Sequence, residues 1–498
     1  MKKICVLSFL LLFLTSISLA GTINLPKTGQ TKCYDSNGTE IACPGTGQDG
    51  DIQAGVAWPE PRFTPNADTT LTDNLTGLIW SPNGNIMPIR NPGWDLDGTV
   101  NDGGVTWQHA LDYVAKLNSE NYLGHNDWRL PNVNELESLI NANEADIAAW
   151  INTKGFTNVQ AASYWSSTSF AIYPGGAWLI AMWDGHVPYG SKSSSYYYVW
   201  PVRGGQCGSF DNSVICLPKT GQTKCYDEYS TEIPCPGMGQ DGEIQAGVVG
   251  PSPRFTDYGN GVVTDNLTGL MWTTNTNLPN GLLTWQQALD YVKGMNDGTY
   301  PNFGYIDWRL PNRKELYSLT DFSRYGPALP SGHPFTNVQA NFYWSSTSYA
   351  GYPDGASVVN IWGVGAVDYD YKSYQGYYVW PVRGGQVGPP TVITLSSFTA
   401  TPSDKSVMLT WITESEIDNA GFNLYRAEAE DGEYVKINSS LIPAQGSPTQ
   451  GATYQFIDGN VQNRKTYYYK LEDIDLNGKS AMHGPVGAMP RVIYGLER

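Results

Sequence analysis

The side chains in this sequence that could bind or react with a ligand are carboxylates, aromatic rings and serines gathered in a few short stretches. The densest carboxylate group is Asp95 and Asp97, followed by Gly98 and then Asp102. Alternating oxygen ligands around a glycine turn suit calcium, which takes six to eight oxygens. Because the distal glutamate of an EF-hand is absent, a solvated Asp/Gly loop remains the alternative. We expect no required cofactor, and calcium as the ion that Asp95, Asp97 and Asp102 could hold.

Aromatic rings dominate two regions, residues 170–197 and 349–377, where the two halves of the sequence differ most. Tyr and Trp rings can stack on the faces of sugars, and carboxylates accept bonds from sugar hydroxyls. The alternative is that the rings close a small core, which we expect of Trp183 and Trp362. The residues that we expect to bind a ligand are Tyr173, Trp178, Asp184, Tyr189, Tyr352, Asp368 and Tyr369.

Patterns for catalysis are weak. Ser166, Ser167 and Ser169 have no His or Asp within their motif and no nucleophile elbow around them. Arg129 and its copy Arg309 could hold an anion, but an Arg beside a Trp inside a folding unit usually satisfies buried carbonyls or a carboxylate. We therefore predict no catalytic residue and a mainly structural role for both arginines.

The elements that must position these side chains are duplicated. The string DWRLPN at residues 127–132 returns at 307–312, and each closing Asn stands three residues before a Glu, the spacing of a capping box at a helix start. Another helix is predicted after Thr106, where apolar residues recur at helical spacing. Its inward face is Trp107, Ala110, Leu111, Val114 and Leu117. Thr284 and Gln287 add a capping box in the second copy, and the remainder predicts short strands between turns.

The order of the motifs TDNLTGLxW, TWQxALDYV, DWRLPN, YWSSTS and VWPVRGG resembles the Lcl carboxy-terminal domain family, long described as a domain of unknown function. The WRLPN and VRGG segments also resemble the sulfatase-modifying, formylglycine-generating enzymes, which implies a C-type-lectin-like fold. Those enzymes use a cysteine pair in the core of the domain. Here no cysteine lies between Cys43 and Cys207 and none follows Cys235, so an oxidoreductase of that kind is the third and least favoured function.

Several segments follow from these patterns. Lys2-Lys3, an apolar run and Ser18-Leu19-Ala20 are typical of a signal peptide, so we expect export. Strands around Trp411 and Tyr425 resemble a fibronectin type III-like sandwich. The predicted division is 1–20 signal peptide, 21–47 disulfide-bearing arm, 48–206 lectin-like repeat 1, 207–239 disulfide-bearing junction, 240–386 lectin-like repeat 2, 387–391 linker and 392–498 fibronectin type III-like sandwich.

Six cysteines follow the signal peptide, and an even number in an exported chain favours disulfides. We pair near neighbours as Cys33–Cys43, Cys207–Cys216 and Cys225–Cys235. The string LPKTG at residues 25–29 and 217–221 looks like a sortase signal. Such signals belong near a C-terminus, so we treat both copies as chance.

The net charge is −17, and −19 without Lys2 and Lys3, which excludes nucleic acid as the expected partner because that partner requires a basic footprint. No stretch after the signal approaches the ~20 apolar residues that span a bilayer. The predicted fold class is α+β, with two tandem C-type-lectin-like domains of short antiparallel strands and two helices each, plus a C-terminal all-β sandwich.

The predicted function is an exported, non-catalytic binding protein, secreted or at the cell surface, that acts as an adhesin for an extracellular glycan or surface polymer. The alternative is a structural envelope or appendage component that binds another envelope protein.

Overall fold

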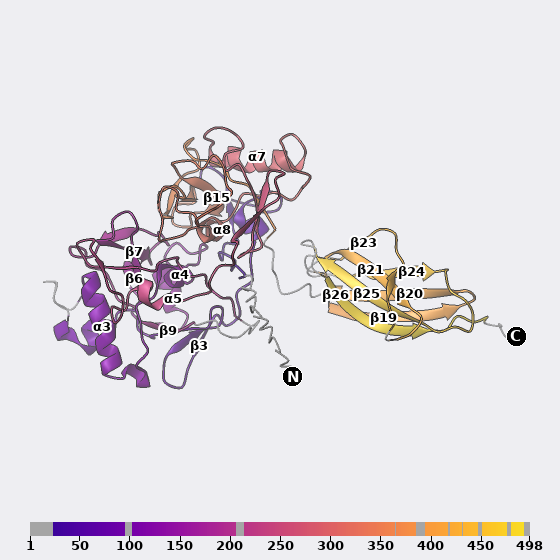
Figure 1. Cartoon of the computed structure of the whole chain (residues 1–498), viewed down its shortest axis with the longest axis horizontal. Coiled ribbons are helices and arrows are strands. Elements are labelled where there is room, and N and C mark those ends of the chain that lie inside the picture. The colour runs from indigo at the N-terminus through magenta and orange to yellow at the C-terminus, as the bar shows by residue number, and fades with distance from the viewer. Residues whose placement is uncertain are drawn as a thin grey trace, which may run out of the picture.

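A computed structural model describes residues 23–94, 102–205, 214–363, 365–384, 394–416, 419–430, 432–446, 451–475 and 480–492 (Figure 1). The expected signal peptide, two of the expected calcium ligands, Asp95 and Asp97, and the cysteine Cys207 lie outside these residues. Within the described part of the chain, no helix is long and apolar enough to cross a membrane.

The first repeat and the segment before it are built from short elements. The strands are β1 (Cys33–Tyr34), β2 (Glu40–Ile41), β3 (Phe63–Pro65), β4 (Leu71–Asp73), β5 (Leu78–Trp80), β6 (Ser163–Ser169), β7 (Gly176–Ala181), β8 (Tyr189–Ser191) and β9 (Val202–Gly204). The α-helices are α1 (Asp49–Ile52), α2 (Met87–Arg90), α3 (Trp107–Ser119), α4 (Val133–Glu137) and α5 (Ile147–Asn152), and the 3-10 turns are η1 (Pro92–Trp94) and η2 (Tyr122–Gly124). The strands form an antiparallel sheet β3-β4-β5-β9, a second sheet β6-β7-β8 and the hairpin β1-β2.

The second repeat reproduces this plan with fewer helices. Its strands are β10 (Cys225–Tyr226), β11 (Glu232–Ile233), β12 (Phe255–Asp257), β13 (Val262–Asp265), β14 (Met271–Thr273), β15 (Tyr343–Ser348), β16 (Gly355–Val359), β17 (Val367–Tyr371) and β18 (Val382–Arg383). Its helices are α6 (Asp241–Ile244), α7 (Trp285–Asn296) and α8 (Arg313–Ser318). The sheets β12-β13-β14-β18 and β15-β16-β17 and the hairpin β10-β11 match those of the first repeat.

The C-terminal region contains two antiparallel sheets, drawn in orange and yellow in Figure 1. Its strands are β19 (Thr394–Ser403), β20 (Ser406–Ser415), β21 (Asn419–Ala427), β22 (Val435–Lys436), β23 (Ile442–Pro443), β24 (Thr453–Asp458), β25 (Tyr467–Asp475) and β26 (Ser480–Ala488). One sheet has the order β19-β20-β24 and the other the order β22-β21-β25-β26, with β23 also paired to β21. Trp411 of the first sheet and Phe422 of the second belong to one buried cluster between them.

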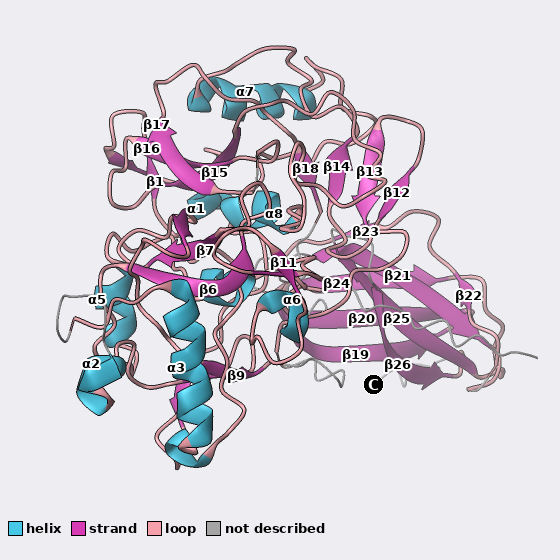
Figure 2. Ribbon diagram, turned by 60° about the vertical axis from the view of Figure 1, so that its left-hand side comes forward, coloured by secondary structure: helices cyan, strands magenta, loops and turns pink. Residues whose placement is uncertain are grey.

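The two repeats share a core. One cluster contains buried rings from both, including Trp80 and Trp200 of the first repeat and Trp272 and Trp380 of the second. Further clusters lie under α3 and α7, which occupy opposite ends of the repeat pair in both views (Figures 1 and 2). Removing this apolar surface from water is the main term that holds the repeats together.

The expected fold class is wrong. The repeats are mostly β, with many small sheets, and they are not clear two-helix C-type-lectin-like domains. Among the described helices only α3 and α7, with 13 and 12 residues, are longer than six. Helix α4 ends at Glu137 although apolar residues continue at Leu139 and Ile140. The N–H groups of these two residues bond the carbonyls three residues back, Leu136 and Glu137, in tight turns that replace the α-helical pattern.

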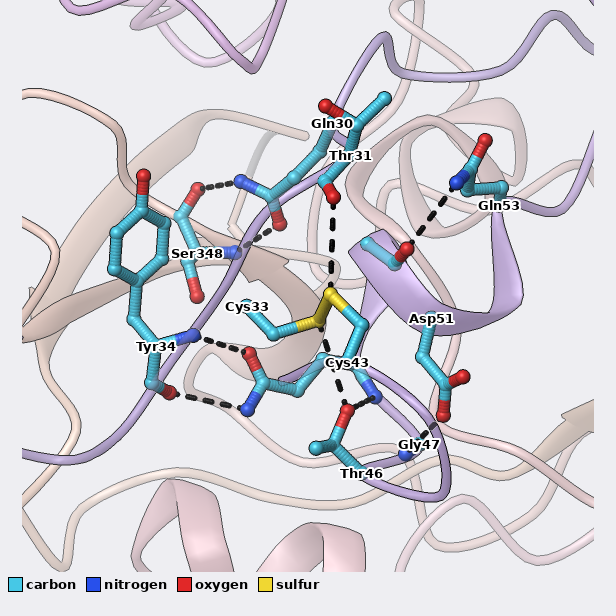
Figure 3. The surroundings of a disulfide bond; sticks show 12 residues. Gln30, Thr31, Cys33, Tyr34, Cys43, Thr46, Gly47, Asp51, Gln53 and Ser348 are labelled. Atoms are coloured by element: carbon cyan, nitrogen blue, oxygen red, sulfur yellow. Dashed lines mark hydrogen bonds between the residues drawn. A yellow bond between two sulfur atoms is a disulfide. The ribbon is translucent and has the colours of Figure 1, made fainter. Parts of the chain in front are cut away.

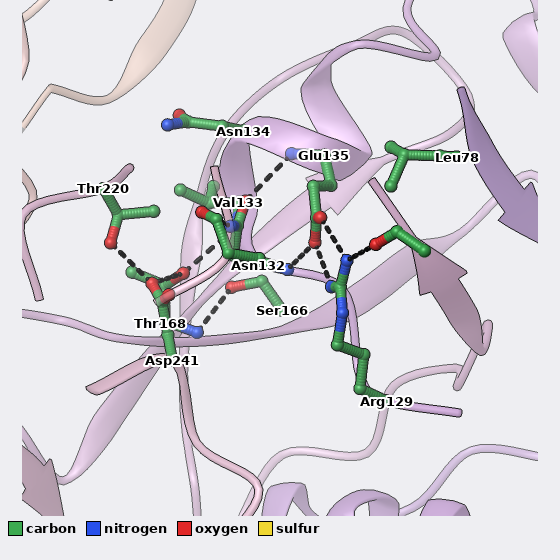
Figure 4. Close-up of polar contacts among 12 residues, drawn as sticks. Leu78, Arg129, Asn132, Val133, Asn134, Glu135, Ser166, Thr168, Thr220 and Asp241 are labelled. Carbon is green, nitrogen blue, oxygen red and sulfur yellow. Dashed lines mark hydrogen bonds and ion pairs between the residues drawn. The ribbon is translucent and has the colours of Figure 1, made fainter. Parts of the chain in front are cut away.

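The joints around the DWRLPN motifs are as expected. Asn132 and Glu135 form a capping box, and so do Asn312 with Glu315 and Thr284 with Gln287. The Arg129 guanidinium forms a buried bidentate ion pair with the Glu135 carboxylate and donates to the Gly204 carbonyl (Figure 4). Arg309 repeats this arrangement, so the structural role predicted for both arginines agrees with their contacts.

Two of the three predicted disulfides are confirmed, Cys33–Cys43 and Cys225–Cys235. Each closes a hairpin, and Figure 3 shows the first with its neighbours. Cys216 is disulfide-bonded. Its predicted partner, Cys207, lies outside the described residues, so that pairing stays a prediction.

Candidate ligand-binding site

The sheets β6-β7-β8 and β15-β16-β17 meet at a seam between the two repeats. The Val187 N–H donates to the Val367 carbonyl at 3.0 Å across this seam. Each valine stands two residues before a tyrosine, Tyr189 or Tyr369, which pairs in its own sheet with Trp178 or Ser357. The two variable regions of the sequence are therefore neighbours, and their side chains can form a joint surface.

Three tyrosines of the second repeat gather beside this seam. The rings of Tyr349 and Tyr369 stack face to face, with centroids 4.0 Å apart and an interplanar angle of 6°. The Tyr352 ring lies 5.9 Å from the first and 6.1 Å from the second. Because these distances are nearly equal, Tyr352 lies beside the stacked pair, where its ring is 60% exposed.

A charged bridge from the first repeat borders these rings. His186 Nδ1 contacts Asp184 Oδ2, and His186 Nε2 lies 2.8 Å from Asp368 Oδ1 of the second repeat. The Tyr349 hydroxyl donates to Asp184 Oδ2 at 3.1 Å, and the imidazole lies 5.0 Å from the Tyr369 ring. We call these residues the charged stack: Asp184, His186, Tyr349, Tyr352, Asp368 and Tyr369.

The two carboxylates keep His186 protonated at neutral pH. Burial lowers the pKa of His186, but the bonds and charges of Asp184 and Asp368 outweigh burial and raise this pKa to about 9. Burial has the opposite effect on Asp368 and raises its pKa, but the bond to His186 holds the pKa of Asp368 below its usual value. The bridge thus carries two negative charges and one positive charge at a tyrosine surface.

The equivalent place in the first repeat lacks these charges. Phe170 and Tyr189 stack with centroids 3.9 Å apart at 4°. Tyr173 lies in the turn before β7, where its carbonyl accepts from the Gly176 N–H as Tyr352 accepts from Gly355 in the second repeat. Tyr173 and Tyr189 are 52% and 54% exposed. We call Phe170 and Tyr189 the apolar stack.

Trp178 is not part of either exposed surface, which corrects the prediction that it binds ligand. It is 1% exposed, packing edge-on against Phe170 at 5.2 Å and against Phe322 of the second repeat at 5.4 Å. Trp183 and Trp362, expected in the core, are instead 40% and 38% exposed. The difference follows the strand bounds, because every residue of β7 is buried, whereas Trp183 and Trp362 lie beyond the ends of β7 and β16.

Sequence analysis did not predict three residues that build the stacks, Phe170, His186 and Tyr349. Tyr349 and Phe170 directly follow the YWSSTS motif, and this shared position was the available signal. His186 has no counterpart at an equivalent motif position, so only the fold reveals that it bridges two carboxylates. Of the expected ligand residues, the structure brings Asp184, Tyr352, Asp368 and Tyr369 together. It places Tyr189 in the other stack and Tyr173 in the turn before β7.

The structure describes one of the three expected calcium ligands. Asp102 Oδ1 accepts from the Gly104 N–H at 2.8 Å, so this carboxylate closes a local turn. Among the residues that the structure describes, no group of three acidic, His or Cys side chains could hold a metal ion.

The model of the Lcl C-terminal domain matches residues 69–203 and 261–383, together more than half of the chain. The chain belongs to this family. The first matched segment contains the sheet β6-β7-β8 and the second contains the sheet β15-β16-β17. No curated protein matches the chain.

Solved structures give weaker likenesses to the Lcl-domain chain. One is an Fn3-like protein from Clostridium thermocellum, at 17% identity, covering 20% of this chain and 95% of that one with a TM-score of 0.14. Another is a β-1,2-glucanase from Parabacteroides distasonis, at 16% identity, covering 27% of this chain and 19% of that one with a TM-score of 0.14. TM-scores of this size do not establish a shared fold.

Proposed function

We propose that this Lcl-domain protein is an exported, non-catalytic binding protein, an adhesin whose ligand is a carbohydrate or surface polymer. The observation that carries the proposal is the pair of aromatic stacks at equivalent positions of the two repeats. Each has two parallel rings and an exposed tyrosine: Tyr352, 60% exposed, lies beside one pair, and Tyr189, a member of the other pair, is 54% exposed. Exposed, rigidly held rings of this kind suit contact with the apolar faces of sugars.

Two sites on one chain favour a repetitive ligand. A polymer that contacts both stacks converts the second contact into an intramolecular event, so weak individual sites give high overall affinity. The charged stack adds carboxylate and imidazolium groups that can bond hydroxyls, whereas the apolar stack adds only rings and hydroxyls. We therefore expect the two stacks to differ in affinity.

The serines of the YWSSTS motifs support a role without catalysis. Ser166 Oγ donates to the Trp178 carbonyl, and its copy Ser345 Oγ donates to the Ser357 carbonyl. All residues of β6 and β15 are buried. A hydroxyl that is buried and bonded to the neighbouring strand stabilises the sheet.

A glycan array with the purified chain from Gly21 tests the proposal. Tyr352→Ala and Tyr189→Ala should each weaken binding about 2- to 10-fold, the effect of losing one stacking contact. The double variant should lose more than the product of the two because avidity is lost. Tyr258→Ala is the matched control, since Tyr258 is 55% exposed but lies on β12–β13, away from both stacks.

Unchanged binding by the double variant would contradict the placement of the site. Binding to envelope proteins with no glycan bound would favour the alternative, a structural appendage component.

A further inference from the structure

The segments that precede the two repeats have the same sequence pattern and the same structure. We call residues 23–58 arm 1 and residues 215–250 arm 2. Each contains LPKTGQTKCY, a disulfide-closed hairpin and a one-turn helix, α1 or α6. Arm 1 precedes repeat 1 along the chain, and arm 2 precedes repeat 2.

We infer that the arms are docking modules exchanged between the repeats: each arm fills a binding seat on the other repeat, and the partner it fits is the other arm-bearing repeat. Arm 1 lies in a seat on repeat 2, and arm 2 lies in the equivalent seat on repeat 1. Each arm also touches its own repeat, where the Ala142 N–H donates to the Thr28 carbonyl and the Phe322 N–H to the Thr220 carbonyl. The seat consists of the YWSSTS strand and the helix start that follows DWRLPN.

A buried carboxylate makes the central contact. Asp241 Oδ2 of arm 2 accepts from Thr168 Oγ1 of repeat 1 at 2.7 Å and from Thr220 Oγ1 of its own arm at 2.6 Å (Figure 4). Thr168 Oγ1 in turn accepts from the Val133 N–H, the first residue of α4. The threonine hydroxyl thus accepts from a helix N–H that has no partner within the helix and donates to the carboxylate of the arm.

The same contact occurs between arm 1 and repeat 2. Asp49 Oδ2 of arm 1 accepts from Thr347 Oγ1 of repeat 2 at 2.7 Å and from Thr28 Oγ1 at 2.6 Å. Thr347 Oγ1 accepts from the Arg313 N–H at the start of α8. Both aspartates are about 1% exposed, so water does not compete for these bonds.

A glutamine from each arm bonds the end of the YWSSTS strand. Gln30 Nε2 donates to the Ser348 carbonyl at 2.8 Å, and the Ser348 N–H donates back to Gln30 Oε1 at 2.8 Å (Figure 3). Gln222 Nε2 of arm 2 donates to the Ser169 carbonyl at 2.9 Å. Thr28, Gln30 and their copies belong to the LPKTGQ strings, so the arms use this motif for docking.

A buried lysine holds the hairpin of each arm. Lys192 Nζ of repeat 1 lies 3.8 Å from the Trp107 ring and donates to the Tyr226 carbonyl of arm 2 at 3.0 Å. Lys372 Nζ of repeat 2 lies 4.2 Å from the Trp285 ring and donates to the Tyr34 carbonyl of arm 1 at 3.2 Å. Lys192 Nζ also donates to Ser169 Oγ, but the contacts that both lysines share are the indole and the arm carbonyl.

Buried charges at the seam favour pairing of repeat 1 with repeat 2 over pairing of two identical repeats. Glu137 of repeat 1 accepts from Lys314 Nζ of repeat 2 at 2.8 Å, with Arg313 Nη2 at 3.6 Å, and all three are buried. Repeat 1 carries Val133 and Asn134 where repeat 2 carries these two cations. Two copies of repeat 2 would bury cations without a carboxylate, a cost that disfavours like pairing.

Cross-linking in the full chain tests the exchange. A protease site is placed within residues 208–213 in a Cys207→Ser, Cys216→Ser background, so that no native disulfide joins the halves. Gln30→Cys is combined with Ser348→Cys, the exchanged partner, or with Ser169→Cys, the equivalent residue of its own repeat. After cleavage and denaturation without reductant, the first pair should keep the halves joined. The second pair lies within one half, so its halves should separate and both introduced thiols should remain free in the N-terminal fragment.

Release of the halves by the first pair, or a disulfide between the two introduced cysteines of the second pair, would overturn the inference. A cross-linked species of twice the chain mass would show exchange between chains and also overturn the assignment of partner. A second measurement needs no new cysteine: the cleaved chain should elute at its intact size under native conditions, and elution of separate halves would contradict the exchanged arms. Neither outcome depends on ligand binding.

Discussion

Trp178 and Ser357 hold equivalent positions on β7 and β16, opposite Tyr189 and Tyr369, yet they support different surroundings. The indole fills the space behind the apolar stack and reaches Phe322 of the other repeat. The serine adds no ring, and the charged bridge of Asp184, His186 and Asp368 borders the second stack instead. A few substitutions at equivalent positions therefore made two unlike surfaces from one framework.

Trp178→Ala should destabilise the repeats without acting directly on a ligand. Removing a fully buried indole leaves a cavity, so the free energy of unfolding should fall by about 3–5 kcal/mol. Denaturant unfolding measures this, with Trp183→Ala as the matched control because Trp183 is 40% exposed. The control should cost under about 1 kcal/mol. Equal effects would place Trp178 outside the core.

Arg309→Ala should be costly for an electrostatic reason. It removes the partner of the buried Glu315 carboxylate and a donor to the Gly384 carbonyl, leaving a buried charge that should lower stability by about 3–5 kcal/mol. Arg383→Ala is the control, because its partner Asp307 is half exposed and such pairs contribute about 0–1 kcal/mol. If thermal unfolding shows both variants alike, the ion pair does not hold this joint.

The His186 bridge predicts a dependence of stability on pH. The folded-state pKa of about 9 lies above the ordinary 6.5, so the stabilisation is fully present below pH 6.5 and is lost as the pH rises through 9. The difference in melting temperature between the wild type and His186→Gln should therefore be large at pH 6 and disappear above pH 9. A difference that stays constant over this range would show that the imidazolium charge contributes nothing.

At the scale of elements, the sequence predicted the features that depend on neighbouring residues. The helix after Thr106 forms as α3 with the expected inward face, and the capping boxes at Asn132, Thr284 and Asn312 are present. These features depend on contacts within a few residues, so spacing reveals them.

Features that depend on contacts between distant segments could not be predicted from the sequence. The segment after α4 bonds a distant part of the chain, because the Ala142 N–H donates to the Thr28 carbonyl of arm 1, more than a hundred residues away. Trp178 is buried by a ring of the other repeat, which no local pattern encodes. The charged stack was only partly predicted, since Asp184 and Asp368 were expected but the histidine between them was not.

The disulfides of the arms should matter through the unfolded state. Each closes a loop of about ten residues, and its removal should lower stability by about 2.5–3 kcal/mol in the chain-entropy model. Cys33→Ser with Cys43→Ser should therefore cost about as much as Cys225→Ser with Cys235→Ser, measured by urea unfolding. Because the arms are equivalent, a large effect of one pair alone would argue against matched docking. Peptide mapping without reductant should also find Cys207 joined to Cys216.

At the scale of the whole molecule, buried contacts join the two repeats. Buried rings of both repeats form a common cluster, the arms cross in both directions, and Glu137 bridges to Lys314. The cluster between the C-terminal sheets contains no residue of either repeat. Since cooperativity follows shared contacts, the repeat pair should unfold together and the C-terminal region separately.

Calorimetry of the chain from Gly21 should therefore show two transitions, with the repeat pair giving the larger unfolding enthalpy because it contains more residues. Glu137→Gln leaves Lys314 and Arg313 buried without their carboxylate, so it should lower the stability of the repeat transition by about 3–5 kcal/mol while keeping it single. Glu120→Gln is the matched control, because the partly exposed pairs of Glu120 contribute about 0–1 kcal/mol. Three transitions, or a Glu137→Gln effect confined to one repeat, would show that the repeats fold independently.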